Sequence, residues 1–140
     1  MTTVFRSFLL VFFLAAASVA TRAEEAAFIA HPDVAESSLS ADDVSNILLG
    51  KKTTWGSGPI KLALLSTGSV HEAVAKTFAQ RSADQLDKHW KKLVFTGKGI
   101  MPAQFKTEAE LLDFVSKTPG AFGYVAPGGA TGSVKTIAIQ

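Results

Sequence analysis

Short apolar runs alternate along this chain with amphipathic segments that begin at helix-capping residues, and this alternation limits the possible folds more than any other feature. Four apolar runs have the length and character of β-strands, at residues 26–30, 60–65, 121–125 and 134–139. Four segments carry apolar residues at helical spacing, and they begin at Ser40, Ser69, Ser82 and Thr107. The pattern predicts an α/β domain with a mostly parallel sheet flanked by helices.

Three of these helix starts carry the Ser/Thr-x-x-Glu/Gln pattern of a capping box, in which two side chains satisfy backbone amides at the helix end. The three boxes are Ser69–Glu72, Ser82–Gln85 and Thr107–Glu110. Gly50 and Gly97 follow apolar stripes and predict helix ends, because glycine readily adopts the left-handed conformation found there. Residues 51–59 are rich in glycine and proline breakers and predict a loop.

The first 23 residues have the layout of a secretory signal peptide. Arg6 precedes ten apolar residues at 8–17, and small residues follow up to Ala20 and Ala23, either of which fits the cleavage position. The apolar run is shorter than the about 20 residues of a membrane-spanning helix, and no cysteine follows it for a lipid anchor. The sequence therefore predicts a periplasmic protein whose mature chain, residues 24–140, forms one domain without a membrane span.

The composition of the mature chain argues against several functions. Cleavage after residue 23 leaves 12 basic and 12 acidic residues, and the pairs Lys51–Lys52 and Lys91–Lys92 are too isolated to predict nucleic-acid binding. No G-x-S-x-G motif is present, so an enzyme is not expected. The chain has no cysteine, and its histidines lack metal-site spacing, so no metal or other cofactor is expected. Surface or half-buried positions are predicted for the three histidines, His31, His71 and His89.

One segment, Ser66-Thr67-Gly68-Ser69, has the pattern of a ligand site, since it follows a predicted strand and opens a predicted helix. The first amides of a helix have no intrahelical partner and lie at the positive end of its dipole. Gly68 would let an anion approach the backbone, and the three hydroxyls would add donors. The alternative is an ordinary helix cap made by Ser69 and Glu72, whose carboxylate would also repel an anion. From these local residues alone, the ordinary cap is the favoured interpretation.

Several segments, in order, resemble the later part of periplasmic phosphate-binding proteins of ABC transporters. Residues 39–58 (LSADDVSNILLGKKTTWGSG) are similar to that family's stretch of helix, glycine, basic residue and tryptophan. Residues 89–105 (HWKKLVFTGKGIMPAQF) resemble its Trp, Gly and Pro segment, and residues 115–125 (VSKTPGAFGYV) resemble its closing Gly-x-x-Gly-Tyr pattern. Residues 66–69 stand where the family has its Ser-Gly-Thr anion loop, and the similarity extends over residues 28–125. The resemblance implies one lobe of a type II periplasmic-binding-protein-like fold, with phosphate or a related oxyanion at residues 66–69.

The resemblance leaves two hypotheses open. Family members hold the ligand between two lobes, and their anion loop is accompanied by an arginine that has no counterpart from Lys61 to Glu72. The first hypothesis is an oxyanion-binding domain whose site is weak, or is completed by self-association or by another envelope protein. The second is a ligand-free interaction module that keeps the lobe fold. The first is the preferred assignment.

Overall fold

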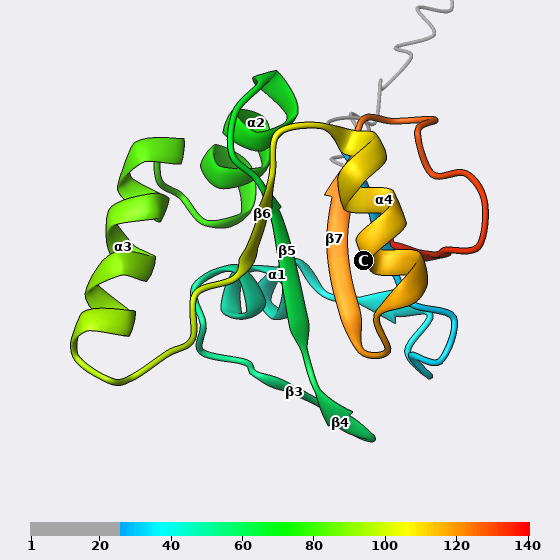
Figure 1. Cartoon of the computed structure of the whole chain (residues 1–140), viewed down its shortest axis with the longest axis horizontal. Coiled ribbons are helices and arrows are strands. Elements are labelled where there is room, and N and C mark those ends of the chain that lie inside the picture. The colour runs from blue at the N-terminus through cyan, green and yellow to red at the C-terminus, as the bar shows by residue number, and fades with distance from the viewer. Residues whose placement is uncertain (1–25) are drawn as a thin grey trace, which may run out of the picture.

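The computed structural model describes residues 26–140, which form a six-stranded sheet with four helices packed around it (Figure 1). The predicted signal peptide lies outside these described residues. The strand order is β2-β8-β1-β7-β5-β6. These strands are β1 (Ala27–Ala30), β2 (Ser38–Leu39), β5 (Lys61–Leu65), β6 (Ala103–Phe105), β7 (Ala121–Val125) and β8 (Lys135–Ile139). A separate hairpin pairs β3 (Thr54–Trp55) with β4 (Gly58–Pro59).

The predicted mostly parallel sheet is confirmed. Strand β5 pairs in parallel with β6 and β7, and β2 pairs in parallel with β8. Strand β1 is antiparallel to both of its neighbours, β7 and β8, so it alone among the six described strands runs against the others. In Figure 1, α4 (Glu108–Lys117) lies in front of the sheet and α1 (Ala41–Leu48) behind it. Helices α2 (Ser69–Phe78) and α3 (Ala83–Phe95) follow β5.

Four strands and four helices lie where the sequence predicts them, within a few residues. The loop prediction for residues 51–59 is wrong, because this segment contains the β3–β4 hairpin. Strands β2 and β6 are also absent from the prediction. They have two and three residues, which is too short to show the alternating pattern of a strand. Their pairing with β8 and β5 defines them instead.

Local capping chemistry sets most of the helix starts. The Ser82 box forms as predicted, with reciprocal bonds between Ser82 and Gln85. Thr107 Oγ1 accepts from the Glu110 amide at 3.2 Å. The box predicted at Ser69–Glu72 does not form, because the N-cap is Gly68, without a side-chain cap bond. With a φ of 104° at Gly68, the helix starts one residue earlier than expected, and Ser69 is its first residue.

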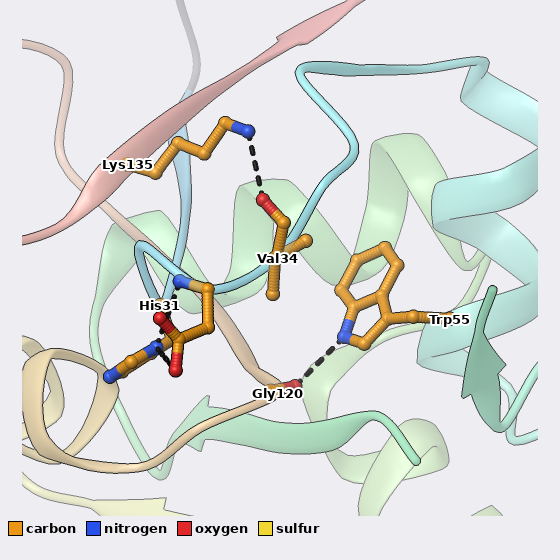
Figure 2. Close-up of polar contacts among 6 residues, drawn as sticks. His31, Val34, Trp55, Gly120 and Lys135 are labelled. Carbon is orange, nitrogen blue, oxygen red and sulfur yellow. Dashed lines mark hydrogen bonds and ion pairs between the residues drawn. The ribbon is translucent and has the colours of Figure 1, made fainter. Parts of the chain in front are cut away.

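Aromatic side chains fill the centre of the core and fix the hairpin to the sheet. Phe28 stacks on Phe122 at 5.7 Å, and Trp55 meets Phe122 edge-on at 5.8 Å. Trp55 Nε1 also donates to the Gly120 carbonyl oxygen at 2.9 Å, which ties the hairpin to the start of β7 (Figure 2). Lys135 Nζ donates to the Val34 carbonyl oxygen at 2.8 Å (Figure 2). None of the helices in residues 26–140 has the length and apolar character needed to cross a membrane.

Candidate functional site

The loop from Ser66 to Ser69 connects β5 to α2 at the carboxyl ends of the parallel strands β5 and β6. Ligands of open α/β sheets bind at this edge. The Ser66 amide donates to the Phe105 carbonyl oxygen at 2.8 Å, and the Ser66 hydroxyl donates to the same oxygen at 3.2 Å. The Ser66 hydroxyl therefore holds the loop against β6. Within the described chain, no hydrogen bond engages the hydroxyls of Thr67 and Ser69.

The start of α2 presents backbone amides without a side-chain cap. The first helical bond runs from the Glu72 amide to the Gly68 carbonyl oxygen at 3.1 Å. The amides of Ser69, Val70 and His71 precede that bond and have no intrahelical partner. Gly68 has no atom within 4 Å of the position that a Cβ would occupy, so its surroundings are open. This geometry contradicts the ordinary side-chain cap and leaves these amides without a side-chain cap bond.

The loop and the helix start line a cavity of about 340 Å³, which we call the α2 cavity. Its volume lies near the lower end of the range of about 300–1,000 Å³ found for small-molecule sites. The four loop residues that the sequence singles out are exposed, and three of them, Ser66, Thr67 and Gly68, line the cavity. Its other polar lining residues come from α2, α3 and β6, and they are His71, Glu72, Asp84, Asp87 and Gln104.

His71 lies at the inner side of the α2 cavity and is only 6% exposed. Its Nδ1 is 2.5 Å from the Tyr124 hydroxyl oxygen, and that oxygen accepts from the buried Leu65 amide at 3.1 Å. Burial lowers the pKa of His71, and the nearby carboxylates of Glu72 and Asp87 partly oppose this shift. Burial raises the pKa of Tyr124. Both groups are therefore neutral at pH 7.

The hydrogen bonds of the Tyr124 hydroxyl bear on the tautomer of His71. The Tyr124 oxygen accepts from the Leu65 amide, so its single proton is available for Nδ1 of the imidazole. A neutral imidazole with an accepting Nδ1 carries its proton on Nε2. His71 therefore brings a neutral imidazole to the lining of the α2 cavity.

Three carboxylates surround this cavity, and two of them are paired. Asp84 lies 3.0 Å from Lys88, and Asp87 lies 2.7 Å from Lys91. The hydrogen bond from Lys91 is the main cause that lowers the pKa of Asp87. Glu72 takes part in none of the ion pairs between the described residues. No arginine is among the described residues that line the cavity, and no cluster of metal ligands is found in residues 26–140.

The sequence predicts the loop but not the side chains that line the same cavity. The histidine prediction is wrong for His71, which is buried and bonded to Tyr124. The two residues are 53 positions apart in the sequence, and no local pattern connects them. One signal was available: His71 is the third residue of the helix after the loop, and side chains of the first helical turn lie close to the cap.

No protein-family model and no curated protein matches the sequence, whereas solved structures match the fold. An ABC-type phosphate transport receptor from Vibrio cholerae matches with 14% identity and a TM-score of 0.55, over 81% of this chain and 45% of that chain. A putative phosphate ABC transporter substrate-binding protein with bound phosphate from Clostridium perfringens matches with 18% identity and a TM-score of 0.65, over 81% of this chain and 44% of that chain. PstS from Borrelia burgdorferi matches with 17% identity and a TM-score of 0.56, over 82% and 47%.

These matches show a shared fold. This chain spans less than half the length of each of the three solved proteins. The described residues therefore have the fold of one lobe of phosphate ABC transporter substrate-binding proteins. The resemblance expected from the ordered sequence segments is confirmed at the level of this fold.

Proposed function

We propose that this chain is an exported solute-binding domain that binds phosphate or a related small oxyanion in the α2 cavity. The observation that carries the proposal is the start of α2. Gly68 caps the helix without a side-chain bond, so the amides of Ser69, Val70 and His71 are available at the positive end of the helix dipole. The hydroxyl of Thr67 and the neutral imidazole of His71 add polar groups at the same cavity.

The fold supports the same ligand class. One protein that shares the fold was solved with bound phosphate. Because the chain spans less than half of that protein, we propose that a second copy of the chain or another envelope protein supplies the rest of the ligand shell. We place this binding in the periplasm, after removal of residues 1–23 as a signal peptide.

The charges around the cavity set the expected affinity of the chain alone. Arginine supplies bidentate, charge-assisted bonds to phosphate, and none is present in the cavity lining among the described residues. The unpaired carboxylate of Glu72 repels an anion. We therefore expect binding by the isolated chain in the millimolar range, equivalent to about 4 kcal/mol.

A thermal-shift titration of the purified protein with phosphate, sulfate and molybdate tests the proposal. A ligand that binds only the native state stabilises it by RT ln(1 + [L]/Kd), so the melting temperature rises with the ligand concentration. Phosphate should raise it, and the double variant Thr67→Ala, Ser69→Ala should abolish the shift. The matched double variant Thr54→Ala, Ser57→Ala, in and next to the β3–β4 hairpin, should keep it. Replacing Glu72 by Gln should enlarge the shift.

The second candidate function is the ligand-free interaction module. The observation that favours it is the unpaired Glu72 carboxylate beside a cavity without arginine. If none of the three oxyanions shifts the melting temperature at tens of millimolar, and Glu72→Gln does not restore a shift, the oxyanion proposal is refuted. An interaction module then remains as the function of the lobe.

A further inference from the structure

A second cavity lies at the opposite end of β5 from the α2 cavity. Lys61 and Leu62, at the start of the strand, line it, whereas Leu64 and Leu65, at the end of the strand, line the α2 cavity. Its volume is about 690 Å³, well inside the range of about 300–1,000 Å³ found for small-molecule sites. We call it the lysine cavity, after the residues described below.

The wall of the lysine cavity is mainly apolar. Its large apolar side chains come from α1, β5, α3, α4 and the segments beside them, and they include Ile47, Ile60, Leu62, Trp90, Pro102 and Phe114. Ile100 and Met101 extend this wall outward, and Ile100 is 90% exposed. An aliphatic chain would therefore find apolar surface both inside the cavity and at its edge.

The charged part of the lining is entirely positive. Lys52, Lys61 and Lys98 line the cavity from three different segments. None of the described residues that line it is an aspartate or a glutamate. The ion pairs found in residues 26–140 do not involve these three lysines, so their charges are not neutralised by partners within the described chain.

Hydrogen bonds and close packing hold the walls in place without a ligand. Trp90 Nε1 donates to the Leu48 carbonyl oxygen at 2.9 Å, which joins α3 to α1. A Cβ on Gly50 would come within 2.8 Å of the Trp90 ring, so the backbone at the end of α1 packs directly on the indole. Trp55 ties the hairpin to Gly120 (Figure 2). The cavity is therefore largely preformed, which lowers the entropic cost of binding.

We propose that the lysine cavity binds an amphipathic anion, a medium-chain aliphatic carboxylate whose chain lies against Trp90 and whose head group meets Lys52, Lys61 and Lys98. The apolar wall selects the aliphatic chain of the ligand, and the three lysines select its negative charge. The proposal does not depend on oxyanion binding, because the two cavities share no lining residue.

Calorimetric titration of the purified protein with octanoate, decanoate and dodecanoate tests how much the aliphatic chain of the ligand contributes to binding. Each methylene buried should tighten binding about fourfold, because it contributes about 0.8 kcal/mol. Decanoate should therefore bind about fifteen times more tightly than octanoate, and tryptophan emission should change with the same midpoint. An affinity that does not depend on chain length would overturn the proposal.

Charge selection is tested with a cation of the same chain length and with lysine variants. Decyltrimethylammonium should bind at least tenfold more weakly than decanoate. The double variant Lys52→Gln, Lys98→Gln should weaken decanoate binding at least fivefold, whereas the matched variant Lys76→Gln, on α2, should not. Equal binding of anion and cation, or equal binding by both variants, overturns the proposal. Binding to anionic phospholipid vesicles without binding of monomeric decanoate also overturns it.

Discussion

Replacing Tyr124 by Phe removes one oxygen atom from the core, and this oxygen joins β5 to α2 through Leu65 and His71. The Tyr124 hydroxyl accepts from the Leu65 amide at 3.1 Å and lies 2.5 Å from His71 Nδ1. Both partners are buried, with Leu65 4% and His71 6% exposed. The variant keeps the ring, which is stacked on His71 at 6.1 Å between centroids, so packing changes little and the loss is almost entirely polar.

The expected cost follows from the two groups that lose their partner. A buried donor or acceptor left without a partner costs about 1–3 kcal/mol. The Leu65 amide at the end of β5 cannot turn to solvent, whereas the His71 ring can recover part of its cost because it lines the α2 cavity. We therefore expect the variant to lower the free energy of unfolding by about 2–4 kcal/mol, a large share of the about 5–15 kcal/mol typical of a domain.

Urea unfolding followed by circular dichroism measures this loss. With a slope of about 2 kcal/mol/M, the middle of the usual range for urea, the midpoint should fall by about 1–2 M. The same substitution in a His71→Leu background should cost less, because only the Leu65 amide then loses its partner. A loss below about 0.5 kcal/mol in the otherwise unchanged protein would refute the reasoning. It would mean that the Tyr124 hydroxyl contributes little through its bonds with the Leu65 amide and His71.

Two further predictions concern the same edge of the sheet. Gly68→Ala should destabilise the fold by about 1–3 kcal/mol and abolish any phosphate-induced shift in melting temperature, because alanine disfavours a φ of 104°. The control Gly58→Ala, at a position that is equally open but has no positive φ, should change stability by less than about 0.5 kcal/mol. Equal losses of stability in the two variants would contradict this explanation. Because burial lowers the pKa of His71, the unfolded chain binds more protons below its ordinary pKa of about 6.5, so stability should be fully present above that pH and fall as the pH decreases. Urea titrations from pH 7.5 to 5 measure this, and a His71→Gln variant with the same slope would contradict it.

The elements that were predicted correctly depend on local chemistry. Ser40 and Ser82 each form a reciprocal box with the residue three positions later, so a window of four residues is enough to place both helix starts. Strand β6 has no such signal. It is a strand only because Ala103 to Phe105 lie beside Ala63 to Leu65, and that pairing is set by the tertiary fold.

The candidate site also has one part that local sequence predicts and another part that only the tertiary fold determines. The segment from Ser66 to Ser69 is recognisable because a strand, a glycine and a helix follow one another directly in the sequence. The hydroxyl of Tyr124 belongs to β7, and only the parallel pairing of β5 with β7 places it beneath the loop. Even within the loop, the role predicted for Ser69 is wrong. The pattern Ser-x-x-Glu predicts a box, but the positive φ of Gly68 moves the cap by one residue.

The charges around the α2 cavity explain why binding by the isolated lobe should be weak and why a partner would strengthen it. Lys88 and Lys91 neutralise Asp84 and Asp87, which leaves about one negative charge, that of Glu72. The start of α2 contributes the equivalent of about half a positive charge. The charges of the lining residues therefore sum to a slightly negative value, and the hydrogen-bond donors of the cavity must hold the anion. A cationic surface from a second copy or another protein would reverse that sign and increase the association rate as well as the affinity.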